Sequence, residues 1–139
     1  MDTKFSVALH ILIMFSETTE KLTSEKIAKS VNTNPSHIRK IITFLKKANL
    51  LTRQKGTFEY SLVKDKSVLN LFDIYKAVNP DKLLYTHQNS NKNCPVGHSI
   101  NKVLDPIIIE AEKELENYLS KIFLLDVIEK IRKEITENN

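Results

Sequence analysis

The chain has 139 residues, of which 41% are hydrophobic and 27% are charged, and its formal net charge is +4. Two glycines and four prolines favour a mainly α fold with few loops, in one domain with an added arm. A single cysteine excludes an intrachain disulfide framework, and no apolar run is long enough to cross a bilayer, so we expect a cytoplasmic protein with no membrane partner.

The basic charge is concentrated in one segment. Residues 21–66 hold eleven Lys/Arg against three acids, a balance of +8, whereas the remainder holds ten against fourteen, a balance of −4. Such a concentration is the electrostatic footprint of a nucleic-acid-binding face. A basic helix on a membrane surface is the alternative, but Ile and Leu here form a core stripe without the Trp/Phe edge of such helices.

The first predicted helix spans residues 5–15 and is apolar on two sides. One face carries Phe5, Leu9, Leu12 and Phe15, and another carries Val7, Ile11 and Met14. A helix that is apolar on two sides must be buried by more than one neighbour. We expect it to pack on the following helix pair and on a second subunit.

Residues 23–51 predict two short helices joined by a polar turn. Thr23 or Ser24 caps the first helix, and Asn34 caps the second, with Pro35 at the first helical position, where a missing donor costs nothing. Apolar residues at helical spacing give the second helix one buried face: Ile38, Ile41, Ile42, Leu45 and Ala48. Its other face is polar and basic. This is the layout of a DNA-reading helix-turn-helix, although an ordinary helix pair with a solvated basic face has the same pattern.

The early residues of the second helix are the candidates for reading bases. We favour Ser36, Arg39 and Lys40 for direct contacts, because Arg often holds the O6 and N7 atoms of guanine. His37 is given less weight and is placed along the phosphate backbone. The other candidates for phosphate contacts are lysines: Lys26, Lys29, Lys46, Lys47 and Lys55.

Residues 50–63 predict a β-hairpin, because apolar and polar side chains alternate and Gly56 suits a turn that needs positive φ. A hairpin after a helix-turn-helix is a wing. Arg53 and Lys55 lie near its tip, from which basic residues reach the minor groove or phosphates. A solvated hairpin tip would hold the same residues.

The remaining segments predict a helix over 71–78 capped by Asn70, a flexible loop over 81–98 that contains Cys94, a long helix over 99–119 and a last helix over 126–135. Pro106 either kinks the long helix or starts a fresh segment. The long amphipathic helix is expected to form a dimer interface. The predicted organisation is a winged helix-turn-helix domain (1–80), the flexible loop (81–98) and dimerisation helices (99–139).

Taken together, these segments resemble the Rrf family of bacterial winged-helix transcription regulators, which includes an iron–sulfur cluster regulator, a nitric-oxide-sensitive repressor and a cysteine-metabolism repressor. The resemblance rests on VALHILI, EKIAKSVNTNPSHIRKIITFLKKANLL, the short wing, LNLFDIYKAV, CPVG and the long helix that follows. It implies a homodimer that binds a two-fold operator and usually represses.

The chain departs from this family at two places. The wing tip, Lys55-Gly56-Thr57-Phe58, holds less glycine than is usual in the family. Members that bind a cluster have three cysteines in the region of Cys94, whereas this chain has one. Several thiolates normally hold an iron–sulfur cluster, so we expect no cluster, no other cofactor and no metal site.

Cys94 is interpreted as a redox-sensing thiol. A position before a helix N-terminus would stabilise the thiolate and lower its pKa. An oxidised Cys94 would form a disulfide with the partner subunit's Cys94 or with a small thiol. The alternative is a small buried apolar residue without reactivity.

The sequence therefore predicts a homodimeric, sequence-specific DNA-binding transcriptional repressor that responds to oxidants through Cys94. The alternative is a small-molecule-sensing or protein-interaction helical dimer without DNA binding. An enzyme is not expected, because the chain has no Gly-rich phosphate loop, no metal-spaced His pair and no nucleophile motif.

Overall fold

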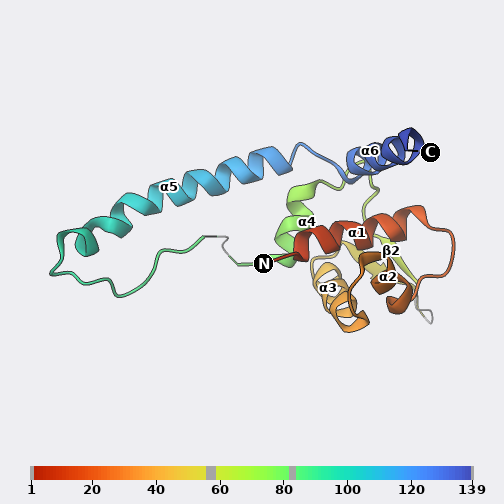
Figure 1. Ribbon diagram of the computed structural model, residues 1–139, viewed down its shortest axis with the longest axis horizontal. Coiled ribbons are helices and arrows are strands. Elements are labelled where there is room, and N and C mark those ends of the chain that lie inside the picture. Colours follow the sequence, from red (N-terminus) through yellow and green to blue (C-terminus); the bar gives the residue numbers. More distant parts are fainter. Residues whose placement is uncertain (1, 56–58, 82–83, 139) are drawn as a thin grey trace.

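The computed structural model describes residues 2–55, 59–81 and 84–138. Within these ranges the chain forms six helices and one two-stranded sheet (Figure 1), which confirms the predicted mainly α winged helix-turn-helix fold. The elements are α1 (Lys4–Glu17), α2 (Ser24–Val31), α3 (Pro35–Lys47), β1 (Leu51–Arg53), β2 (Tyr60–Leu62), α4 (Leu71–Val78), α5 (Pro95–Leu119) and α6 (Leu124–Glu137). None of the helices in the described part of the chain is long and apolar enough to cross a membrane.

Helix α1 lies at the centre of the folded domain. It contacts α2, α3, α4, β2 and α6, so its two apolar sides are covered by several neighbours, as its sequence predicts. Ile11 and Leu12 of α1 are fully buried, and so are Ile38 and Ile41 of α3. These side chains form one core that holds the helix-turn-helix in place.

The wing follows α3 directly. Strands β1 and β2 are antiparallel, with Leu51 opposite Leu62 and Arg53 opposite Tyr60. Leu51 is buried and anchors the hairpin to the core. The turn predicted at Gly56 lies outside the described residues.

Helix α6 is joined to the same core by backbone pairing. Leu71 donates its N–H to Ile122 O at 2.9 Å, and Leu124 donates its N–H to Leu69 O at 2.8 Å. Leu124 and Ile128 are buried, and α6 contacts α1. The helix starts at Leu124, two residues before the predicted start, and packs on the winged domain.

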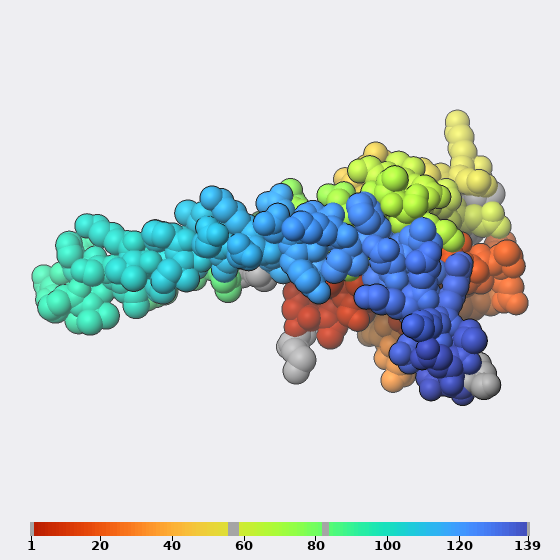
Figure 2. Space-filling view, turned by 90° about the horizontal axis from the view of Figure 1, so that it is seen from above, coloured from red at the N-terminus to blue at the C-terminus, as the bar shows by residue number. Residues whose placement is uncertain are grey.

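Helix α5 is an arm that extends away from the folded domain, with the segment before it running along the same side (Figures 1 and 2). It starts at Pro95, four residues earlier than predicted, with Cys94 as its N-cap. It continues through Pro106 to Leu119, so Pro106 does not start a fresh segment. The predicted loop over 81–98 therefore ends at Cys94.

Candidate nucleic-acid interface

The turn between α2 and α3 is set by local hydrogen bonds. Thr23, rather than Ser24, caps α2: its Oγ1 accepts the N–H of Lys26 at 3.2 Å. At the other end, Asn32 adopts a left-handed conformation with φ 66°, which Asn tolerates better than most residues. Thr33 then donates its N–H to Ala28 O at 2.9 Å, which closes the helix end and directs the chain into α3.

The start of α3 has the cap that the sequence predicts. Asn34 Oδ1 accepts the N–H of His37 at 2.9 Å, and Pro35 occupies the first helical turn. Ser36 also donates its hydroxyl to Asn34 Oδ1, at 2.6 Å. Its side chain is exposed, and its hydroxyl oxygen retains lone pairs for another donor.

The two faces of α3 differ as expected, except that Ala48, predicted on the buried face, is exposed at the C-cap. Ile38, Ile41 and Leu45 are fully buried. Arg39 and Lys40, by contrast, are exposed, as is Lys46 two turns later. His37 is half-buried, so it has less freedom to reach outward than its neighbours.

Arg39 has an acidic neighbour that is not predicted from the sequence. Its Nη1 lies 4.0 Å from Oε1 of Glu25 on α2, and the two side chains are 58% and 71% exposed. An ion pair this exposed contributes little free energy, so an incoming anion or base edge can replace Glu25 at low cost. An acid in the first turn of α2 was visible in the sequence, but its partner depends on how α2 packs on α3.

The structure brings part of the predicted site together. Arg39, Lys46 and Arg53 line one hollow between α2, α3 and the hairpin. Lys46 Nζ lies 5.6 Å from the centroid of the Tyr60 ring of β2. Lys55 is exposed further along the hairpin and does not line this hollow.

Cys94 lies apart from this surface, at the start of α5. It is exposed, and the backbone N–H groups of Gly97 and then Val96 lower the pKa of its thiol. The preceding loop is held close, because Ser90 donates its hydroxyl to Gly97 O at 2.6 Å and Cys94 donates its N–H to Asn91 O at 3.2 Å. Cys94 is thus not the buried apolar residue of the alternative interpretation.

No group of three or more His, Cys, Asp or Glu side chains placed to hold a metal ion occurs in residues 2–55, 59–81 and 84–138.

A helix-turn-helix with a capped second helix, a two-stranded wing after it and a basic surface shared by both define a winged helix-turn-helix DNA-binding protein. The chain belongs to the Rrf2 family: residues 1–130 match the family described as "Rrf2: Iron-dependent Transcriptional regulator". It is a DNA-binding transcriptional regulator, as the sequence predicts.

Similar proteins agree with this assignment. YwnA of Bacillus subtilis (strain 168), named as a candidate HTH-type transcriptional regulator, is 40% identical over 129 residues, which cover 92% of this chain and 96% of YwnA. A crystal structure of a candidate DNA-binding protein is 40% identical, with a TM-score of 0.75 over 90% of this chain and 98% of that chain. The cysteine regulator CymR of B. subtilis shares the fold at 16% identity, with a TM-score of 0.62 over 91% of this chain and 94% of that one.

Proposed function

We propose that the protein is a cytoplasmic repressor that binds a two-fold DNA operator as a homodimer, through α3 and the wing of each copy. Two features of the described residues carry this proposal: an exposed basic reading surface, and an arm, α5, that leaves several large apolar side chains exposed. The two features together fit a protein that places two reading helices on one duplex.

The arm supports a dimer. Of the 25 residues of α5, all of them described, Leu119 is the one that is buried. Val103, Ile107 and Tyr118 lie within one face at helical spacing and are 61%, 58% and 68% exposed. Large apolar side chains left exposed on one face favour a protein–protein contact, and a second copy of the same helix offers a matching face.

The reading surface supports sequence-specific binding. Ser36, Arg39 and Lys40 are exposed at the start of α3 and are proposed to contact base edges. The remaining candidates are assigned to phosphates or the minor groove: His37, Lys46, Arg53 and Lys55. Arg39 is the residue proposed to hold a guanine through its O6 and N7 atoms.

The dimer is tested by placing one charge on either side of α5. Ile107→Glu puts a carboxylate on the proposed interface and is expected to give monomers in sedimentation analysis. Ile109→Glu is the matched control, because Ile109 is 48% exposed, faces α4 and lies about 200° around the helix from Ile107. If both variants remain dimeric, the α5 interface is rejected.

DNA binding is tested with a duplex taken from upstream of the protein's own gene. The dimer is expected to bind it with an affinity that falls steeply with salt, because bound lysines and arginines release counterions. A monomeric Ile107→Glu protein should bind far more weakly, since it engages one half-site at a time. A dimer without salt-sensitive affinity for the duplex would favour the alternative of a sensing or protein-interaction module.

We further propose that Cys94 adjusts DNA binding in response to oxidants. Its thiolate would attack hydrogen peroxide, so that an S–O bond forms, the O–O bond breaks and hydroxide leaves, giving a sulfenic acid. A second thiol, from a small molecule or from the partner subunit's Cys94, would then form a disulfide and release water. The exposure of Cys94 and its lowered pKa support this assignment.

The sensor proposal is tested with Cys94→Ser. Operator affinity of the wild type is expected to change on treatment with peroxide, and the change should reverse with dithiothreitol. The variant should keep the untreated affinity and show no response. The same oxidant response in both proteins would rule out Cys94 as the sensor.

A further inference from the structure

A cavity of about 480 Å³ lies between α1, α2, α3 and the hairpin, a size typical of sites for small molecules. The aromatic rings of Phe15 and Tyr60 form one wall, with their centroids 5.5 Å apart. Ile27 and Ile42, which are 1% and 5% exposed, contribute apolar surface from the core side. The two ring planes are inclined at 56°, so the inner part of this cavity is suited to an apolar ring that packs against one of them.

The rim of the cavity is positively charged. Among the described residues that line it are Arg39, Lys46 and Arg53, together with the carboxylate of Glu25. Among residues 2–55, 59–81 and 84–138, the side chain of Glu25 pairs with Arg39 alone, in the exposed 4.0 Å contact, so it can turn away at low cost. An anion at the rim would gain charge-assisted hydrogen bonds from Arg39 and Lys46.

We propose that this cavity binds a small organic anion with a planar apolar ring and one carboxylate, and that the anion releases DNA. The ring would pack against Phe15 or Tyr60, and the carboxylate would face Arg39 and Lys46. A DNA phosphate can accept hydrogen bonds from the cations of the rim, but it carries no ring that would cover the apolar wall of the cavity. The release of DNA rests on the proposed function, because release requires that Arg39 and Lys46 also contact DNA. Binding of the anion to the cavity does not depend on the proposed function.

The test uses 2-naphthoate as the probe, titrated into the full-length protein without DNA and followed by calorimetry. Saturable binding is expected, at least about tenfold tighter than that of 2-naphthol, which has the same ring system without the carboxylate. Absence of saturable binding, or equal binding of the two probes, would overturn the proposal.

Three variants locate the bound probe. Lys46→Met removes a rim cation and should weaken 2-naphthoate about tenfold. Lys47→Met is the matched control, because Lys47 follows on the same helix, is exposed and does not line the cavity. Leu22→Trp fills the cavity from the loop before α2, and should abolish probe binding while leaving the circular dichroism spectrum and operator affinity unchanged. Equal affinity of all three variants for the probe would place the binding elsewhere and contradict the proposal.

A final titration adds 2-naphthoate to the protein–operator complex. DNA should be released from the wild type at probe concentrations that saturate the free protein, and should stay bound to Leu22→Trp. Binding of the probe to the cavity without release of DNA would refute the competition. Because probe binding is measured without DNA, its outcome does not depend on whether the operator proposal succeeds.

Discussion

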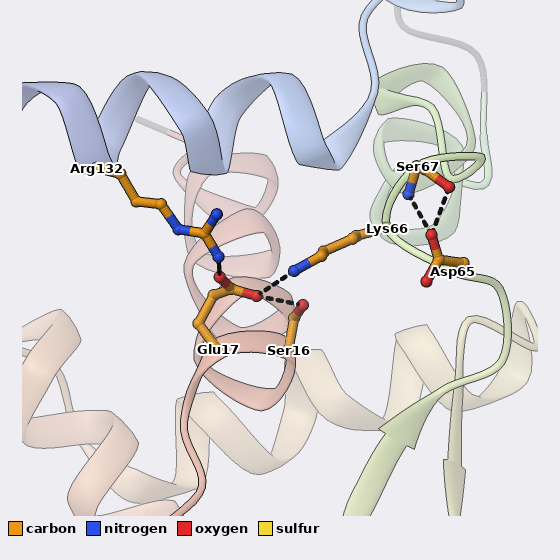
Figure 3. A network of polar contacts seen from close by, with 6 residues as sticks. All are labelled: Ser16, Glu17, Asp65, Lys66, Ser67 and Arg132. Atoms are coloured by element: carbon orange, nitrogen blue, oxygen red, sulfur yellow. Dashed lines mark hydrogen bonds and ion pairs between the residues drawn. The ribbon is translucent and has the colours of Figure 1, made fainter.

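Glu17, at the end of α1, ties three parts of the fold together (Figure 3). Its Oε2 accepts a hydrogen bond from Lys66 Nζ at 2.9 Å, and its Oε1 accepts one from the Arg132 guanidinium of α6. Ser16 donates its hydroxyl to Oε2 at 2.8 Å. Replacing Glu17 by Gln removes the charge that these groups share while retaining the shape of the side chain.

The expected loss of unfolding free energy follows from how exposed the side chains of this network are. The side chain of Glu17 is 21% exposed, that of Lys66 29% and that of Arg132 57%, so water screens the network in part. Surface networks of this kind contribute about 1 kcal/mol to the free energy of unfolding. For a chain of this length that corresponds to a fall in Tm of about 4 °C.

The pH dependence of the Tm difference between wild type and Glu17→Gln tests the role of the Glu17 charge more sharply than the size of that difference at one pH. The hydrogen bond from Lys66, first, and those from Ser16 and Arg132 lower the pKa of Glu17 below its ordinary value of 4.5. The contribution is therefore fully present above pH 4.5 and is lost as the pH falls through the lowered pKa of the folded state. The Tm difference between wild type and Glu17→Gln should be constant near neutral pH and shrink in acid.

The assay is thermal unfolding at pH 7 and at pH 3.5, at equal protein concentration, since dimerisation would make Tm depend on concentration. Glu20→Gln is the matched control, because Glu20 is an exposed acid three residues along the chain and forms none of these contacts. A wild-type Tm for Glu17→Gln at pH 7, or a Tm difference that persists unchanged in acid, would show that the charge of Glu17 does not stabilise the fold.

Substitutions at three further residues test other parts of the structure. Asn34→Ala removes the cap of α3 and should cost about 1 kcal/mol of unfolding free energy, measured by urea denaturation, whereas Asn34→Asp should cost much less. Gly97→Ala places a Cβ 2.3 Å from the carbonyl oxygen of Asn91, so the loop must move and the rate at which Cys94 reacts with a thiol reagent should change; an unchanged rate would contradict the close approach. Leu124→Ala should cost about 3 kcal/mol, because Leu124 is fully buried where α6 joins the core, and a loss below about 1 kcal/mol would indicate that α6 is not docked there.

The helix-turn-helix could be predicted because its signals are local. Asn34 and Pro35 mark the start of α3, and Ile38, Ile41 and Leu45 mark its buried face, so a few residues of sequence specify each feature. The wing was predicted from alternation in the same way. The predicted start of α5 is four residues too late, because Cys94 is a poor cap; Pro95 at the first helical position marks the observed start.

The missed features depend on packing between segments distant in sequence. Glu25 meets Arg39 only because α2 crosses α3. The pairing of Leu124 with Leu69, which docks α6 on the winged domain, joins residues more than fifty positions apart and has no local pattern. Periodicity identifies an apolar face but not the surface that covers it.

The proposed function depends on Arg39 reading DNA from α3, and a comparison of binding affinities tests this role. Fluorescence anisotropy compares wild type and Arg39→Gln on the duplex from upstream of the gene and on a scrambled duplex of equal length. Loss of a bidentate guanine contact should cost about 1–3 kcal/mol on the upstream duplex and much less on the scrambled one, with a similar salt dependence for both proteins. Equal affinity of the two proteins for the upstream duplex, or an equal loss on both duplexes, would contradict this role for Arg39.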